Sequence, residues 1–291
     1  MPWIIRRLYA GFVIAVTLCF AACKPTTTTP TVVTPPAPPP SPQTLRLTWS
    51  DDFDGPAGAP FDATKWVAET GGQGWGNQER EYYTARPQNV SLDGGGHLVI
   101  TARAEALDSS FHCWYGACRY SSARLITKGK FETTYGRFEA RIRVPRGQGL
   151  WPAFWMLGSS IDGVGWPKCG ELDIMENIGR EPDVVHGTMH GPGYSGGNGI
   201  GGQYTLASGS FADDFHVFAL EWSPGNIRWL VDDKLFRAAA PTNLPGGATW
   251  VFNNPFFLLL NVAVGGAWPG DPDSSTTFPQ QMVVDYVRVY Q

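Results

Sequence analysis

The chain has 291 residues, of which 43% are hydrophobic, and a formal net charge of -4. This length allows one domain of about 240 residues with a substantial core, preceded by a leader. The acidic balance and the lack of a Lys/Arg cluster in the sequence argue against nucleic acid or a heavily sulfated polysaccharide as partner, so a neutral polymer fits better.

The N-terminus has the pattern of an export signal, predicted over residues 1–22. Arg6 and Arg7 precede an apolar run over 8–20, which is too short for a comfortable membrane span. The Phe-Ala-Ala-Cys sequence ending at Cys23 resembles a bacterial lipobox, with Phe where Leu is usual. We therefore expect lipidation of Cys23 and an outer-membrane or cell-surface lipoprotein, so that any membrane contact is through this anchor. The alternative is ordinary signal cleavage and a secreted or periplasmic protein.

Residues 23–44 are rich in Thr and Pro and cannot bury apolar area. Such a segment is predicted to be an extended, semi-stiff linker. The folded domain is predicted over 45–291.

Three cysteines lie inside that domain. Cys113 and Cys118 enclose four residues, a spacing that permits a small disulfide loop in an oxidising compartment. No second pair with ligand spacing accompanies them, which argues against zinc. Cys169 is expected to be a small buried residue, since no base stands beside it in sequence.

From residue 45 onward, short alternating or apolar runs are separated by turn signals, and no amphipathic helical pattern exceeds a turn or two. Strands are expected over 98–103, 137–144, 215–222, 227–236 with a turn at Asp232-Asp233, 256–264 and 282–290. Many antiparallel strands predict an all-β sandwich or barrel. We favour a two-sheet antiparallel jelly roll in which one sheet bends into a concave substrate groove.

Tryptophans occur where such a groove would need them. They are Trp75, Trp151, Trp155 and Trp268, beside glycine-rich loops or just before an acidic strand. Indole faces bury the apolar face of a sugar ring while polar neighbours bind its hydroxyls. A core position is an equal alternative for any single one, and Phe154 and Trp222 are assigned to the core. As a set, the four tryptophans predict a carbohydrate groove.

Three carboxylates lie within six residues of an otherwise apolar run, 171–176. In a regular strand Glu171 and Asp173 share one face and Glu176 points to the other, unless one extra residue at Met175 is absorbed in a bulge. With the bulge, the two Glu carboxylates come roughly 5 Å apart, as in retaining glycosidases. Without it, the run is a solvated, calcium-binding or merely charged strand face.

A return strand after this run is expected to bring His190 near Glu176. There a neutral imidazole could bind a sugar hydroxyl or the acid itself. The alternative is a structural His at the Gly-Pro turn that follows.

The acidic run resembles the bulged active-site signature of glycoside hydrolase family sixteen, in its laminarinase-like branch. Further segments similar to family blocks lie at 135–142, 150–157, 166–170, 258–266 and 284–290. Together these segments span about residues 48–291, and in combination they are highly specific.

The resemblance implies a retaining, endo-acting glucanase on a β-jelly roll, with 45–291 as the catalytic domain. It implies Glu171 as nucleophile and Glu176 as acid/base, with Asp173 assisting. The donor subsites implied are lined by Asn77, Arg137, Trp151, Trp155 and His190. No cofactor is implied for catalysis. Many family members hold a structural calcium, and the matching positions here are Asp52, Gly96 and Asp285.

The expected substrate is a laminarin-type β-1,3-glucan, with mixed-linkage β-1,3-1,4-glucan as a further substrate. Mixed-linkage specialists of the family usually lack the bulge residue, here Met175. Lichenan or agarose as substrate, or a non-catalytic glucan-binding protein, are the alternatives. Pure binding has no use for two close carboxylates, so the three acids favour an enzyme. We expect a monomer.

Overall fold

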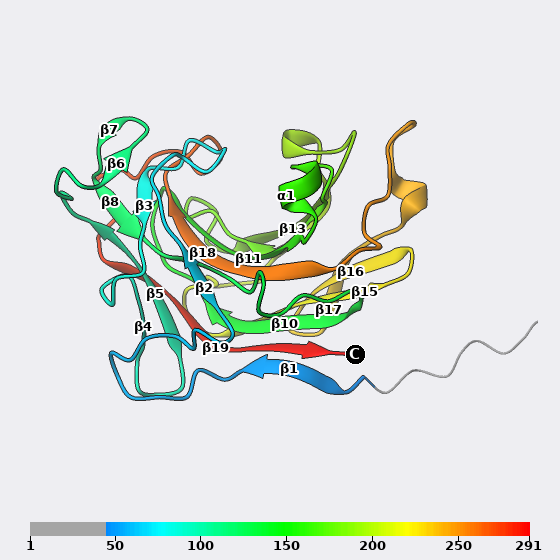
Figure 1. Ribbon diagram of the computed structural model, residues 1–291, viewed down its shortest axis with the longest axis horizontal. Coiled ribbons are helices and arrows are strands. Elements are labelled where there is room, and N and C mark those ends of the chain that lie inside the picture. The colour runs from blue at the N-terminus through cyan, green and yellow to red at the C-terminus, as the bar shows by residue number, and fades with distance from the viewer. Residues whose placement is uncertain (1–44) are drawn as a thin grey trace, which may run out of the picture. The chain divides into compact units, whose positions relative to one another are not determined.

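The computed structural model describes residues 45–291 (Figure 1). The predicted signal peptide, the linker and the lipidation site at Cys23 lie outside the described residues. The described residues form one compact unit. No helix within 45–291 is long and apolar enough to cross a membrane.

Two sheets, antiparallel except for one short parallel pair, are stacked face to face (Figure 1). The first sheet has the strand order β17-β16-β15-β10-β19-β5-β8-β3, with β1 paired to β19 and β4 paired to β5. Its strands are β1 (Leu47–Asp51), β3 (Glu81–Tyr83), β4 (Val90–Leu92), β5 (Leu98–Ala104), β8 (Tyr120–Ser122), β10 (Gly136–Arg143), β15 (His216–Ser223), β16 (Asn226–Val231), β17 (Lys234–Ala239) and β19 (Gln280–Tyr290).

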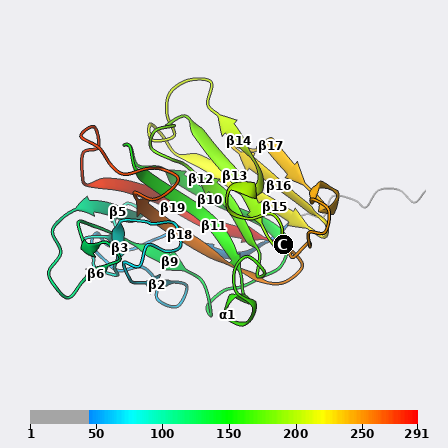
Figure 2. The same ribbon diagram turned by 90° about the horizontal axis from the view of Figure 1, so that it is seen from above.

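The second sheet has the order β14-β13-β12-β11-β18-β9-β2, and Figure 2 shows its long strands side by side from above. Its strands are β2 (Val67–Glu69), β9 (Arg124–Ile126), β11 (Leu150–Gly158), β12 (Glu171–Glu176), β13 (Val184–His190), β14 (Ile200–Thr205) and β18 (Phe256–Val264). The remaining elements are a hairpin of β6 (His112–Cys113) and β7 (Gly116–Ala117), the helix α1 (Ile161–Val164), and the 3-10 turns η1 (Gly196–Asn198) and η2 (Pro241–Asn243).

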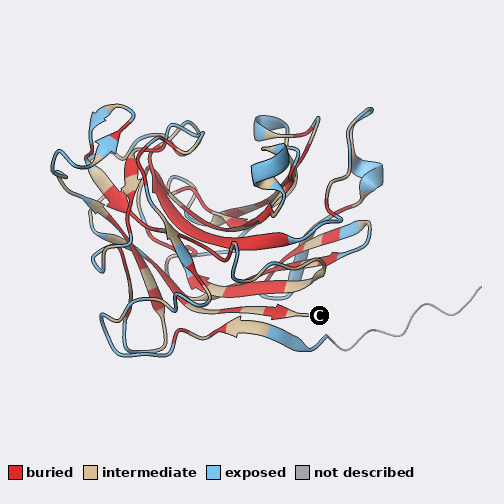
Figure 3. Ribbon diagram, in the orientation of Figure 1, coloured by how far each residue is buried: buried red, intermediate tan, exposed pale blue. Residues whose placement is uncertain are grey.

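The core fills the space between the two sheets (Figure 3). In β10, Phe138, Ala140 and Ile142 are fully buried, while Arg137, Arg141 and Arg143 at the alternate positions stay partly or fully exposed. This alternation is what a strand with one solvated face requires. By contrast, all nine residues of β18 are buried, as its unbroken apolar run predicts for a strand covered on both faces.

These observations confirm the predicted two-sheet antiparallel sandwich. The predicted turn at Asp232-Asp233 joins β16 to β17, and both residues have positive φ (48° and 61°). Two successive positive φ angles define the hairpin turn whose twist matches the flanking strands. The disulfide between Cys113 and Cys118 closes the β6–β7 hairpin, and Cys169 is a buried free thiol, both as predicted.

Candidate active site

The acidic strand β12 contains the predicted bulge. Its pairing with β13 skips one residue, so that Ile174 and Met175 stand together opposite the single residue Gly187. The pairing of β12 with β11 shows the same shift in register. Ile174 and Met175 are both buried in the core. The extra residue therefore restores the alternation, and Glu176 lines the same groove as Glu171.

The opposite sheet holds this bulge in place. Trp229 of β16 donates its indole N–H to the main-chain carbonyl of Asp173 at 2.8 Å. Gly187 leaves the space for that indole, because a Cβ at this position would lie 2.4 Å from Trp229 Cδ1. Neither residue shows this role in its local sequence, because the role arises only from their contact across the core.

Replacing Gly187 with alanine is therefore expected to destabilise the fold by about 1–3 kcal/mol, the usual cost of overpacking a core. The added methyl group must displace Trp229 and with it the hydrogen bond to Asp173. Urea unfolding of Gly187→Ala would measure the loss. Gly163→Ala is the matched control, since a Cβ there meets nothing within 4 Å. Equal stability of the two variants would contradict the proposed packing.

The concave face of the second sheet carries a groove of about 750 Å³. Strands β9, β11, β12, β13 and β18 form its floor, and loops form its walls. The residues that define its chemistry are Trp75, Asn77, Glu79, Arg124, Trp151, Trp155, Trp166, Glu171, Asp173, Glu176, His190, Asn261 and Trp268. Five predicted substrate-binding residues, Asn77, Trp151, Trp155, His190 and Trp268, thus lie together with the three acids.

Each of the two glutamates accepts a hydrogen bond from a tryptophan. Trp151 Nε1 donates to Glu176 Oε1 at 3.0 Å, and Trp166 Nε1 donates to Glu171 Oε2 at 3.1 Å. These bonds fix one oxygen of each carboxylate and leave the other for reaction. Trp166 was not among the predicted site residues, although its place five residues before Glu171 was a usable signal.

His190 lies at the other end of the acidic strand from the one predicted. It pairs with Glu171 in the β12–β13 register, while His186 faces Glu176. An antiparallel return strand places its later residues opposite the earlier residues of its partner, which explains the difference. His190 Nε2 is 3.0 Å from Asp173 Oδ2 and 3.7 Å from Glu171 Oε1. Asp173 Oδ2 has no well-aligned hydrogen bond within the described residues.

The ligand atoms of Glu171, Asp173 and His190 lie within 4.8 Å of one another, a spacing that a metal ion could use. A cation there would neutralise the carboxylate best placed for nucleophilic attack. We therefore interpret the cluster as an acid/base group.

Burial sets the protonation of the three acids. It raises the pKa of Glu171 to about 8, with the charge of Asp173 adding to the effect. The nearby His190 and the Trp166 hydrogen bond act in the opposite direction. Burial raises the pKa of Asp173 and of Glu176 well above the ordinary values, and for Glu176 the charge of Asp173 contributes further. Burial and the neighbouring carboxylates thus favour the protonated form of Glu176, which a general acid requires.

Replacing Trp151 with phenylalanine is expected to move the alkaline limb of the kcat/KM profile to higher pH. The Trp151 N–H favours the charged form of Glu176 and lowers its pKa, so its loss raises the pKa of Glu176 and keeps the acid protonated further into the alkaline range. Trp155→Phe is the control, because that indole bonds to Asn261 instead. A limb that stays in place or moves to lower pH in Trp151→Phe would contradict this role.

The prediction for Arg137 was wrong. This residue lies on β10 of the first sheet, where it contacts Glu139 at 2.7 Å, Glu221 at 3.2 Å and Asp233 at 2.6 Å. Its side chain points out of the sandwich on the side away from the groove. The Tyr-Gly-Arg segment is a strand of the supporting sheet, and its sequence cannot show which sheet carries the substrate.

Arg124 is the arginine that lines the groove. Its guanidinium carbon is 4.7 Å from the Trp75 ring centroid and 4.8 Å from that of Trp155. Arg124 Nε also donates to Glu69 at 2.5 Å. Stacking on both indoles ties the two aromatic platforms together. Arg124 was not among the predicted site residues, because an Arg on a three-residue strand gives no periodic signal.

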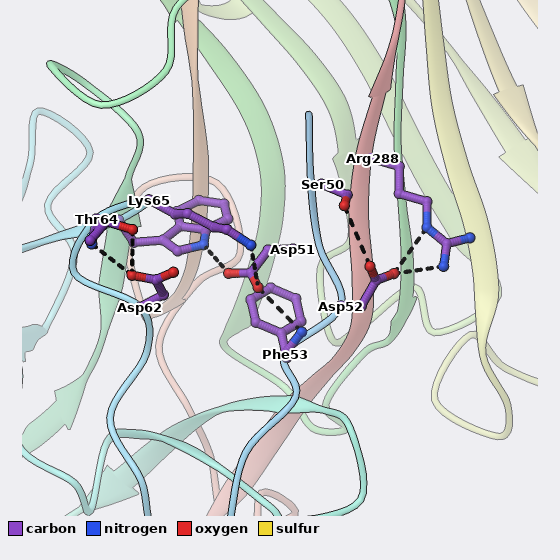
Figure 4. A network of polar contacts seen from close by, with 9 residues as sticks. Ser50, Asp51, Asp52, Phe53, Asp62, Thr64, Lys65 and Arg288 are labelled. Atoms are coloured by element: carbon purple, nitrogen blue, oxygen red, sulfur yellow. Dashed lines mark hydrogen bonds and ion pairs between the residues drawn. The ribbon is translucent and has the colours of Figure 1, made fainter. Parts of the chain in front are cut away.

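The predicted calcium ligands lie on the outer side of the first sheet, away from the groove. A Cβ on Gly96 would be 4.0 Å from the Asp52 carbonyl oxygen, so these two main-chain segments are close. The Asp52 carboxylate points instead to Arg288, 2.6 Å away (Figure 4), and Asp285 Oδ2 accepts from Arg141 at 2.5 Å. The donor set is all oxygen, which suits calcium, but the Asp52 side chain is already paired and leaves its carbonyl as the ligand atom.

A concave antiparallel sheet, an aromatic groove and two carboxylates brought to one strand face define a polysaccharide hydrolase. Comparison with known proteins agrees with this class. Residues 77–288 match the family described as glycosyl hydrolases family 16. The chain belongs to this family.

Two solved structures and one curated relative show the similarity in detail. The endo-β-1,3-glucanase from Pyrococcus furiosus is 48% identical, with a TM-score of 0.79 over 85% of this chain and 94% of that one. The laminarinase catalytic domain from Thermotoga maritima is also 48% identical, with a TM-score of 0.79 over 85% and 98%. A β-glucanase from Rhodothermus marinus is 47% identical over 84% of this chain and 85% of its own length.

Proposed function

We propose that the protein is a retaining, endo-acting hydrolase of β-1,3-glucan, with mixed-linkage β-1,3-1,4-glucan as a further substrate. The observation that carries this proposal is the bulge at Ile174-Met175, which brings Glu171 and Glu176 into one groove. The names of the relatives from Pyrococcus and Thermotoga, an endo-β-1,3-glucanase and a laminarinase, support the substrate class. A groove walled by loops and floored across five strands suits attack within a chain.

The reaction proceeds in two steps. Glu171 attacks the anomeric carbon as the bond to the leaving oxygen breaks, and that oxygen takes the proton of Glu176. Glu176, now a carboxylate, removes a proton from water, whose oxygen attacks the same carbon and releases Glu171. Asp173 lies between the two glutamates on the same strand, and its charge raises the pKa of both. Two displacements at one carbon return the β configuration.

A reducing-sugar assay of the 45–291 domain against laminarin, lichenan, agarose and κ-carrageenan tests the substrate. We expect cleavage of laminarin first and of lichenan second. Proton NMR of the earliest products tests the stereochemistry, and initial release of the α anomer would end the retaining assignment. Binding of laminarin without cleavage would instead favour a glucan-binding protein.

For the structural calcium, we propose that the carbonyl oxygens near Asp52 and Gly96, together with Asp285, form the site. The expected result is a higher Tm in calcium than in EDTA, and a loss of this difference in Asp285→Asn. Arg141→Gln is the matched control, because it breaks the ion pair to Asp285 but keeps the carboxylate. Equal Tm values for the unaltered domain in calcium and EDTA would reject the site. We assign no catalytic step to this ion.

We also propose export as a monomeric lipoprotein. The support is the order of Arg6-Arg7, the apolar run and Cys23 in the sequence. Labelled palmitate should be incorporated by the full chain in a bacterial host and not by Cys23→Ala, and light scattering should give the monomer mass. Release of unlabelled, processed protein would favour ordinary secretion.

A further inference from the structure

One buried carboxylate at the edge of the groove belongs to neither step of the reaction. Glu79 is 3% exposed and lines the groove on its loop side. Asn77 Nδ2 donates to Glu79 Oε1 at 2.9 Å, and the Tyr83 hydroxyl donates to Glu79 Oε2 at 2.9 Å. Both oxygens of this one carboxylate are therefore used by neighbouring side chains.

The Tyr83 branch reaches the floor of the groove. Asn261 Nδ2 donates to the Tyr83 hydroxyl at 3.1 Å, and Trp155 Nε1 donates to Asn261 Oδ1 at 2.7 Å. The Trp155 indole can only donate, so the Asn261 carbonyl must accept, and its amide must then donate to Tyr83. Tyr83 is left with its proton for Glu79. The orientation of Trp155 thus depends on Glu79, the acceptor at the far end of this series of hydrogen bonds.

The Asn77 branch decides what the groove offers to a ligand. An ionised carboxylate can only accept hydrogen bonds, so the Asn77 amide nitrogen must face Glu79. The Asn77 carbonyl oxygen is then the free group, and Asn77 lines the groove. A sugar hydroxyl that meets this oxygen must donate to it.

From this network we infer that Glu79 is a positioning residue for glucan binding, which holds Asn77 with its carbonyl oxygen free and fixes the plane of Trp155. This inference rests on the proposed function, because it concerns how the same groove binds its glucan. It assigns Glu79 no contact with the reacting atoms.

A second buried acid gives the matched control. Glu81 is fully buried in β3, and its Oε2 accepts from the main-chain N–H of Val264 at 2.6 Å. Burial and the neighbouring charge of Glu79 raise the pKa of Glu81 well above its ordinary value. This environment favours the neutral form of Glu81, which has one O–H donor and one acceptor, and an amide reproduces that pattern.

The same substitution at the two positions should give opposite results. In Glu79→Gln the new amide NH₂ must face either Asn77 or Tyr83. Tyr83 is buried and cannot turn its proton to another acceptor, so Asn77 flips and presents N–H to the groove. We expect KM for laminarin to rise about tenfold, with kcat unchanged. Glu81→Gln should leave KM and kcat unchanged, and equal KM values in the two variants would overturn the inference.

A double-mutant cycle tests whether Glu79 acts through Asn77. Asn77→Ala should raise KM by itself, and the double variant with Glu79→Gln should have the same KM as Asn77→Ala. If the fold increases in KM of the two single variants multiply in the double variant, the inference is overturned. Thermal unfolding of each variant shows that the fold is kept. If Glu79→Gln does not fold, Tyr83→Phe is the alternative test. A raised KM supports the hydrogen-bond series from Glu79 to Trp155, and an unchanged KM overturns the inference.

The proposed function and this inference can fail separately. If the unaltered enzyme does not cleave laminarin, the proposed function is wrong. If it does cleave laminarin while Glu79→Gln retains the unaltered KM, only the role of Glu79 is wrong.

Discussion

Replacing Glu171 with glycine is expected to lower kcat on laminarin by on the order of 10⁴-fold or more, because no group remains to form the glycosyl intermediate. The fold should tolerate the change, since the Glu171 side chain lines the groove and not the core between the two sheets. A reducing-sugar assay with thermal unfolding in parallel measures both. Activity within tenfold of the unaltered enzyme would exclude Glu171 as nucleophile.

Added azide gives this prediction a sharper test. In Glu171→Gly, azide can occupy the space of the missing carboxylate. From there it can attack the anomeric carbon of an activated aryl β-laminaribioside on the side of the nucleophile. One displacement replaces two, so the product should be the α-glycosyl azide. The β-glycosyl azide would place azide on the face of the acid/base, and the roles of Glu171 and Glu176 would have to be exchanged.

Replacing Glu176 with alanine is expected to lower turnover of laminarin by roughly 10²- to 10⁴-fold, the usual contribution of a general acid. The loss should depend on the leaving group. A dinitrophenyl glycoside needs no proton to depart, so its first step should stay fast while the second step, now without a base, becomes slow. Stopped-flow measurement should show a burst of dinitrophenol followed by slow turnover.

Glu176→Ala should also respond to azide, here with formation of the β-glycosyl azide, because azide replaces the water of the second step. Glu176→Gln is the matched isosteric variant. It keeps the shape of the side chain and an oxygen for the Trp151 hydrogen bond, but has no acidic proton. If the first step on the dinitrophenyl glycoside slows as much as turnover of laminarin, so that no burst is seen, the acid/base assignment is contradicted.

The longer strands could be predicted because their side chains repeat with a period of two or form an unbroken apolar run. The run 256–264 coincides with β18, and 137–144 differs from β10 by one residue at each end. The short strands β2, β3 and β9 were not predicted. Each has three residues, too few to show a period. β9 pairs with the long strand β18, and β2 and β3 extend the sheet edges by pairing with β9 and β8.

The site was predictable where chemistry is local in the sequence and missed where it is not. The three acids share one strand, and Asn77, Trp151 and Trp155 belong to recognisable segments. Asn261 gave a signal that was not used, since it is the single polar residue in a strand of nine buried ones. Arg124 stacks on Trp155, 31 residues along the chain, and Trp229 bonds to Asp173 across the sandwich. Glu79 bonds to the nearby Tyr83 but reaches Trp155 only through Asn261 of a distant strand. No local pattern reports such partners.

By itself, the sequence determined the longer strands and the condition under which the three acids of 171–176 share one face. Because side chains alternate, acids at 171, 173 and 176 can share a face only if one residue is absorbed, and this holds whatever the rest of the chain does. Only the tertiary structure decided which groups surround those acids. It turned Arg137 away, brought Trp166 to Glu171, and buried the three acids so that their pKa values rise. Burial and contact between distant segments are properties of the packed sandwich, so no single segment contains them.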